Sequence, residues 1–163
     1  MNDISVFTYE EYLEKYGTLT YRNVGVSMMP LLKQGRDIFT VRKKEADRCR
    51  KYDVVLYRRP PDKYVLHRIV EVRENDYVIL GDNCINKEYG IKDCDIIGVM
   101  TEFVHKGKTY SVNDIRYRIY SILWCSFSGI RIFLNTEFRF FRYTINFQRL
   151  TVRLTSRIVL FAF

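Results

Sequence analysis

The feature that most constrains the fold is a series of short apolar segments between Leu19 and Lys108. They are rich in β-branched and aromatic residues and are bounded by Gly, Pro, Asn or Asp. Branched and aromatic side chains fit a pleated surface and the bounding residues favour turns, so these segments predict β-strands. The expected strands are Asp37–Val41, Asp53–Tyr57, Tyr64–Arg73, Tyr77–Leu80 and Ile96–Val104. Many short strands indicate a mainly β fold, with the sheet closed into a barrel or packed as a sandwich.

One short helix is expected before the strands. Thr8 and Glu11 have the spacing of a capping box, in which each side chain accepts a hydrogen bond from the other residue's backbone. Gly17 supplies a residue that readily adopts the left-handed conformation at a helix end. These signals predict a helix over residues 9–16.

The composition changes near residue 109. Residues 1–109 hold 19 Lys and Arg against 17 Asp and Glu, whereas residues 110–163 hold 8 Arg, no Lys and 2 acids. The second part is also rich in aromatic residues, without an apolar run long enough to span a membrane. It is therefore expected to be helical and either to lie in the interface of an anionic membrane or to pack on the β domain.

The four cysteines show neither a CxxC motif nor zinc-site spacing. Without a secretory signal at the start of the sequence, they are interpreted as reduced thiols on the cytosolic side of a membrane. A bridge between Cys84 and Cys94 is the alternative.

Ser27 and His67 are the candidate catalytic residues. Ser27 lies between Gly25 and Pro30, where the chain is expected to turn sharply. A serine hydroxyl becomes a good nucleophile only when a neighbouring base removes its proton, and the chain has two histidines. His67 lies within a regularly alternating strand that can fix its orientation, whereas His105 lies in a polar turn and is expected to be solvated. The alternative interpretation gives Ser27 and His67 structural roles only.

Four segments carry a family resemblance. They are GVSMMPLLKQGRDIFTV from residue 25, KYDVVLYRRP from residue 51, VLHRIVEV from residue 65 and GDNCINKEYGIKDCDIIGVM from residue 81. In this order they resemble the nucleophile, strand, general-base and closing segments of type I signal peptidases. A histidine at the base position resembles the endoplasmic-reticulum-type branch of that family. The resemblance covers about half of the chain. It departs from the family at Tyr52, where the family usually has glycine, and at Leu31, where the family usually has a small residue.

The resemblance implies roles for individual residues. Ser27 would attack the scissile carbonyl, and His67 would accept its proton and return it to the leaving amine. Asp82 would orient the imidazole or support the site from behind. Glu88 and Asp93 are the other candidates for this third role, and the choice stays open.

The substrate contacts are also implied by position. Met28, Pro30 and Gly25 would contact the substrate, and the backbone N–H of Ser27 would stabilise the oxyanion. Many relatives add a serine hydroxyl two residues before the nucleophile, which Gly25 cannot supply. Loss of one such donor typically costs about 3 kcal/mol of transition-state stabilisation. The resemblance implies no metal ion and no cofactor.

The function expected from the sequence is that of a serine endopeptidase acting on signal or leader peptides, with small residues before the cut. Residues 1–109 would form the peptidase domain, peripherally associated with a bacterial cytoplasmic membrane on a side that the sequence leaves undetermined. One alternative is a catalytically inactive peptide-binding module with the same fold. Another is a nucleic-acid-binding relative of self-cleaving repressors, but the lysine base and helix-turn-helix of those proteins are not evident in the sequence.

Overall fold

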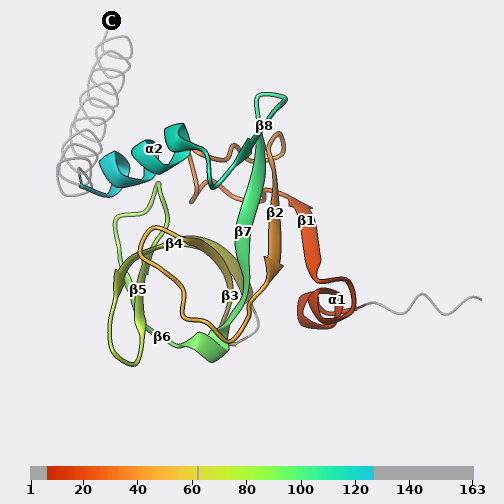
Figure 1. Ribbon diagram of the computed structural model, residues 1–163, viewed down its shortest axis with the longest axis vertical. Coiled ribbons are helices and arrows are strands. Elements are labelled where there is room, and N and C mark those ends of the chain that lie inside the picture. Colours follow the sequence, from red (N-terminus) through yellow and green to blue (C-terminus); the bar gives the residue numbers. More distant parts are fainter. Residues whose placement is uncertain (1–6, 62, 127–163) are drawn as a thin grey trace, which may run out of the picture. The chain divides into compact units, whose positions relative to one another are not determined.

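Eight antiparallel strands and two α-helices make up the part of the chain that the computed structural model describes, residues 7–61 and 63–126 (Figure 1). The mainly β fold class expected from the sequence is confirmed. In chain order the elements are α1 (Tyr9–Tyr16), β1 (Thr18–Arg22), β2 (Ile38–Lys43), β3 (Val54–Arg59), β4 (Lys63–Val72), β5 (Tyr77–Leu80), β6 (Glu88–Ile91), the short 3₁₀ helix η1 (Asp93–Asp95), β7 (Ile96–His105), β8 (Lys108–Ser111) and α2 (Ile115–Ser126).

The strands form a single sheet in the order β1-β2-β7-β3-β4-β5-β6, with β8 paired to β7. The five predicted strands correspond to β2, β3, β4, β5 and β7. The strand signals were not strong enough to delimit β1, β6 and β8, which are short and largely exposed. The β6 sequence Glu-Tyr-Gly-Ile carries a glycine at positive φ, so its strand state depends on pairing with β5.

Strand β3 lies at the centre of the sheet and is buried on both faces. Successive side chains of a strand point to opposite faces, and the four residues from Val54 to Tyr57 divide between two clusters. Val54 and Leu56 pack with residues of α1, the Ser27 loop, β2 and β7. Val55 and Tyr57 pack with residues of β4, β5 and β7. An uninterrupted apolar run is what a strand covered on both faces requires.

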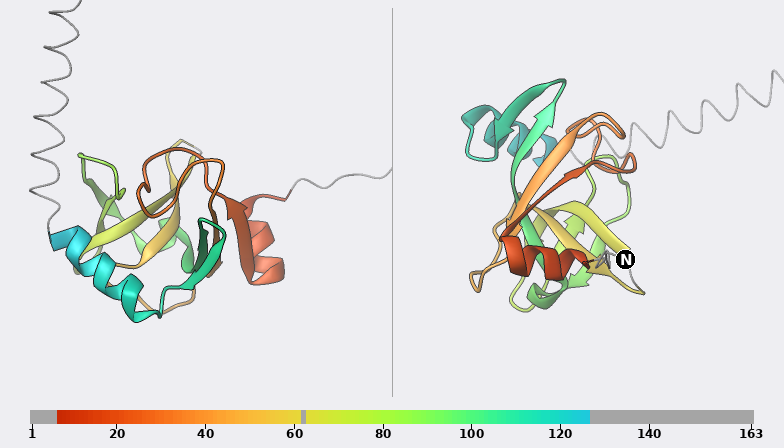
Figure 2. Two further views of the ribbon diagram at one scale, coloured as in Figure 1. Left: turned by 90° about the horizontal axis from the view of Figure 1, so that it is seen from above. Right: turned by 90° about the vertical axis from the view of Figure 1, so that its right-hand side faces the viewer.

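The predicted N-terminal helix is present with the expected boundaries. The hydroxyl of Thr8 accepts a hydrogen bond from the backbone N–H of Glu11, and the Glu11 carboxylate accepts one from the N–H of Thr8. Gly17 ends the helix in the left-handed conformation. Helix α1 lies beside β1 and buries Leu13 against the sheet (Figure 2).

Helix α2 closes the described part of the chain. It packs on the β domain through Tyr117 and Ser121, and the compact unit extends to Cys125, beyond the composition change near residue 109. Helices long and apolar enough to cross a membrane are absent from the described residues. The predictions for residues 127–163 lie outside the described residues.

Candidate functional site

Ser27 lies in the loop between β1 and β2 and is partly buried. Gly25, two residues earlier, has a φ of 87°, a conformation that most side chains disfavour. Two hydrogen bonds fix this loop to the turn after β5: the backbone N–H of Asn83 donates to the Ser27 carbonyl at 2.7 Å, and its side-chain amide donates to the Val26 carbonyl at 3.2 Å. The nucleophile candidate is therefore held by a segment more than fifty residues away in the sequence.

His67 lies on β4 with 4% of its surface exposed, and its two ring nitrogens have different surroundings. Nδ1 lies 3.0 Å from Oε1 of Glu88, which places the ring proton on Nδ1 as the donor of that hydrogen bond. Nε2 is the one buried side-chain nitrogen or oxygen of the described residues that has no hydrogen-bond partner. A buried imidazole held at Nδ1, with its Nε2 lone pair unused, is the form of histidine that can accept a proton.

Gly81 lies beside both the His67 ring and the Ser27 backbone. A Cβ atom added to Gly81 would lie 2.8 Å from Nε2 of His67, 2.9 Å from the carbonyl oxygen of Ser27 and 2.6 Å from Sγ of Cys84. All three distances are below van der Waals contact, so only glycine fits between them. The structure thus brings the Ser27 backbone and the His67 ring against the same small residue, although the side chains of Ser27 and His67 are not hydrogen-bonded to each other.

Three side chains form a polar network behind His67. Arg59 donates to both oxygens of Glu88, with Nε at 2.8 Å from Oε2, and Tyr57 donates its hydroxyl to the same Oε2 at 2.8 Å. Burial raises the pKa of Glu88, whereas the hydrogen bonds from Arg59 and Tyr57 lower it. The lowering influences together outweigh burial, so the pKa of Glu88 lies below its ordinary value. Glu88 is therefore an ionised acceptor for the Nδ1 proton of His67.

The surroundings of His67 keep its imidazole neutral. Burial is the largest influence and lowers its pKa, the Glu88 carboxylate opposes this shift, and the charge of Arg59 adds to it. The net pKa lies below the ordinary value of 6.5. At neutral pH the ring is consequently in the form that a general base requires.

Asp82 contacts Arg68 and not His67. Its carboxylate accepts two hydrogen bonds from the Arg68 guanidinium, both at 2.8 Å, and one from the hydroxyl of Tyr120 at 3.1 Å. Arg68 and Asp82 are both almost completely buried. The expectation that Asp82 orients the imidazole directly does not match this geometry, in which Asp82 holds α2 and the turn after β5 onto the sheet.

The alternation of β-strands explains this placement. Arg68 on β4 pairs with Leu80 on β5, and Ile69 pairs with Ile79, so the next pair in this register joins His67 to Gly81. Residues that face each other across a strand pair project to the same side of the sheet. Gly81 is therefore on the His67 side, and Asp82 is on the Arg68 side.

Asp93, the other proposed third member, lies elsewhere. Its carboxylate accepts a hydrogen bond from Tyr77 at 2.7 Å and pairs with Lys44 and Arg48. This cluster joins η1 to the segment after β2. Of the three carboxylates considered from the sequence, the structure brings only Glu88 within hydrogen-bond distance of His67.

The three residues expected to contact the substrate differ in how far they are buried. Met28 has only 1% of its surface exposed and packs in the core, so it is not positioned to touch a bound peptide. Pro30 is exposed and lines an apolar surface cavity with Leu31 and Tyr120. Gly25 is partly exposed at the turn that precedes Ser27.

His105, which the sequence predicted to be solvated, keeps 26% of its side chain exposed but is held by a buried acid. Its Nδ1 lies 2.9 Å from the buried carboxylate of Asp37, which also binds Arg36. The hydrogen bond from Arg36 lowers the pKa of Asp37, which burial alone would raise. This cluster joins β7 to the start of β2, a long-range contact that the polar sequence around His105 did not reveal.

Sequence reasoning did not identify Tyr57, Arg59 and Gly81 as parts of the site. Tyr57 and Arg59 belong to β3, which pairs with β4 in the register Val55 to His67. A hairpin alignment of these two strands could have placed both beside His67. A triad of His, Cys, Asp or Glu side chains positioned to hold a metal ion does not occur within residues 7–61 and 63–126.

The chain was compared with known protein families, curated proteins and solved structures. No protein-family model, curated protein or solved structure matches the chain significantly.

Proposed function

We propose that the chain is a serine endopeptidase of the signal-peptidase type, in which Ser27 is the nucleophile, His67 the general base and Glu88 the residue that orients the base. One observation carries the proposal: the buried Nε2 of His67 has no hydrogen-bond partner among the described residues and lies beside Gly81, as the Ser27 backbone does, while Glu88 fixes Nδ1. The ordered resemblance of four sequence segments to type I signal peptidases supports the same assignment.

The proposed reaction begins when Oγ of Ser27 attacks the carbonyl carbon of the scissile peptide bond. Nε2 of His67 takes the hydroxyl proton, and Glu88 stabilises the resulting imidazolium. The backbone N–H of Ser27 is the proposed donor to the oxyanion. The imidazolium then gives its proton to the leaving amine, and water hydrolyses the acyl-enzyme with His67 again acting as the base.

The substrate is proposed to bind as an added strand. Strand β1 is at an edge of the sheet, and the chain continues from it directly into the Ser27 loop. An extended peptide that hydrogen-bonds to this edge would run toward Ser27. Signal and leader peptides with small residues before the cut are the proposed substrates.

The test is cleavage of a small library of signal and leader peptides, with the products mapped by mass spectrometry. Defined cuts by the wild-type protein are expected to vanish in Ser27→Ala and to persist in Ser111→Ala, which removes a hydroxyl outside the site. Cleavage that survives in Ser27→Ala would show that another group is the nucleophile.

The second candidate is a peptide-binding module without catalysis. It is favoured by the missing hydrogen bond between the Ser27 hydroxyl and Nε2 of His67. Fluorescence anisotropy with the same peptides separates the two functions. Saturable binding of intact peptides, with no products even when anionic vesicles are present, would replace the peptidase proposal with this one.

The pH dependence of cleavage provides a sharper test of the His67 environment. The acidic limb of kcat/KM reports the pKa of the base in the free enzyme, so it is expected below pH 6.5. In Glu88→Gln, removal of the carboxylate that raises the pKa of His67 should move this limb to lower pH. The plateau should also fall by about 10²- to 10⁴-fold, because the tautomer and the imidazolium lose their support.

Arg59→Met should have the opposite effect on the limb. The charge of Arg59 lowers the pKa of His67, so its removal should move the limb to higher pH. Arg58→Met is the matched control, because Arg58 is exposed on the same strand, and its profile should follow that of the wild type. Shifts in the same direction for Glu88→Gln and Arg59→Met would contradict the proposed network.

A further inference from the structure

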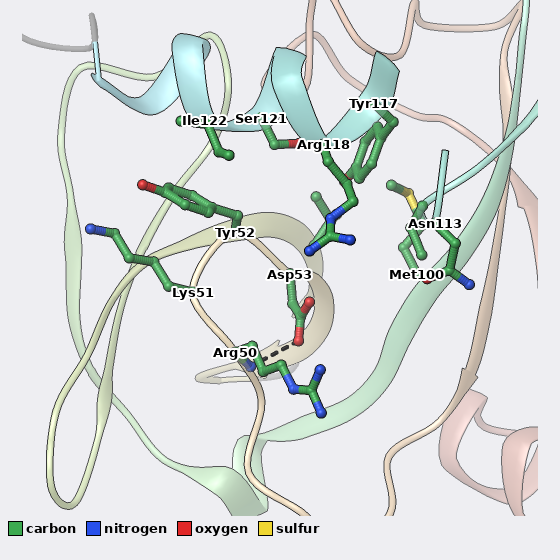
Figure 3. Close-up of a pocket in the computed structure, with 12 residues that line it drawn as sticks. Arg50, Lys51, Tyr52, Asp53, Met100, Asn113, Tyr117, Arg118, Ser121 and Ile122 are labelled. Carbon is green, nitrogen blue, oxygen red and sulfur yellow. Dashed lines mark hydrogen bonds between the residues drawn. The ribbon is translucent and has the colours of Figure 1, made fainter. Parts of the chain in front are cut away.

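A surface cavity of about 270 Å³ lies between the segment that precedes β3, strand β7 and helix α2 (Figure 3). Arg50, Lys51 and Asp53 line one side, and Arg118 and Ile122 of α2 line the other. Figure 3 shows Arg118 extending from α2 toward Asp53. The cavity is large enough for a phosphate group with a short polar substituent.

The cavity carries an excess of positive charge. Among the described residues, Arg50, Lys51 and Arg118 take part in none of the salt bridges of the structure. Asp53 is the only acid in the lining, and one of its carboxylate oxygens already accepts a hydrogen bond from the backbone N–H of Arg50 at 2.8 Å. Three cations around one carboxylate attract an anion, and the planar guanidinium group matches the geometry of phosphate oxygens.

An aliphatic stripe borders the cavity on the same helix. Ile115, Ile119, Ile122 and Leu123 are 68%, 50%, 47% and 51% exposed, and their spacing places them on one face of α2. Ile122 also lines the cavity. Binding of free phosphate would not involve such an apolar stripe. A phospholipid, in contrast, presents a phosphate group directly above an apolar layer. Residues 110–163 as a whole carry eight arginines against two acids, which suits an anionic surface.

We propose that this cavity binds the phosphate group of an anionic phospholipid. Arg50 and Arg118 contact the phosphate oxygens, and Ile119 and Leu123 enter the acyl region of the membrane interface. The Asp53 carboxylate repels a headgroup that carries a carboxylate and accepts a hydrogen bond from one that carries a hydroxyl. Phosphatidylglycerol is therefore preferred to phosphatidylserine at equal surface charge.

The test is sedimentation of the full chain with vesicles of phosphatidylcholine alone or mixed with an equal fraction of phosphatidylglycerol or phosphatidylserine. Binding is expected only to the anionic vesicles, and more strongly with phosphatidylglycerol. Arg118→Glu should weaken it by about tenfold or more, since the change removes a positive charge near the anionic surface and adds a negative one. Ile119→Asp should also weaken binding, because it places a charge in the apolar stripe.

Arg58→Glu is the matched control, since it changes the net charge equally at an exposed site outside the cavity lining. It should weaken binding far less than Arg118→Glu, and equal losses in the two variants would overturn the proposal in favour of non-specific attraction. Titration with inorganic phosphate tests whether the cavity binds free phosphate instead of a lipid headgroup. Saturable phosphate binding that Arg118→Glu abolishes, with no binding to vesicles, would assign the cavity to free phosphate. The readout is independent of peptidase activity, so it can succeed or fail separately from the proposed function.

Discussion

Replacing Asp82 with asparagine is expected to lower the free energy of unfolding by about 3–5 kcal/mol, because the Arg68 guanidinium would lose its counter-charge in a site with no access to water. Arg68 is completely buried, and Asp82 supplies both of the oxygens that face its Nε and Nη2 atoms. The remaining nitrogen of Arg68 donates to the Tyr52 carbonyl and to Tyr117 and Ser121 of α2. Loss of the ion pair therefore weakens the attachment of α2 as well as the turn after β5.

Urea unfolding at pH 7 measures this effect. The matched control is Glu71→Gln, which breaks an exposed ion pair with Arg73 and should change stability little. Cleavage by Asp82→Asn should be compared with that of the wild type at a temperature where both proteins are folded. Under the proposed function, the rate per folded molecule should remain close to that of the wild type. A large loss of rate with unchanged stability would instead support a role for Asp82 at His67.

Alanine at position 81 is expected to damage the site itself. The added methyl group would lie 2.6–2.9 Å from Cys84, His67 and Ser27, so these groups must move by several tenths of an ångström or more. Overpacking of this kind typically costs about 1–3 kcal/mol of stability. A displacement approaching 1 Å between nucleophile and base can lower the cleavage rate about 100-fold.

Gly98→Ala separates the two effects. Gly98 is also tightly enclosed: an added methyl group would lie 3.0 Å from Val41 and 3.1 Å from the Arg42 carbonyl, but Gly98 is on β7, outside the site. Both variants should lose stability, and only Gly81→Ala should lose most of its cleavage rate per folded molecule. Equal rates in the two folded variants would indicate that Ser27 and His67 do not react together across Gly81.

Local signals in the sequence were sufficient for much of the secondary structure. The capping box of Thr8 and Glu11 and the terminal glycine involve contacts within a few residues, so they predicted helix α1 correctly. The apolar run from Val54 to Tyr57 predicted β3, and the alternation around His67 placed that residue on a defined face. The short edge strand β6 was not delimited, because its sequence has no strong preference and its structure depends on pairing with β5.

The identity of the residue behind His67 depended on tertiary structure. From the sequence, Asp82 was the first candidate for this role, and Glu88 and Asp93 in the same stretch after β5 were the other candidates. Strand pairing separates them: Asp82 projects to the Arg68 side, Asp93 is held by Tyr77, and Glu88 lies beside His67 with Tyr57 and Arg59.

The sequence by itself determined helix α1 and five of the eight strands, because propensity, capping and alternation act over a few residues. It also made Ser27 and His67 candidates, through the ordered resemblance of four segments to a known family. Only the tertiary structure decided which carboxylate meets the imidazole, that position 81 has no room for a side chain beside His67 and Ser27, and that Arg50 and Arg118 line one cavity. The physical reason is that hydrogen bonds and charge interactions act over a few ångströms. The partners in these contacts lie far apart along the chain and meet only when the strands pair and α2 packs against them.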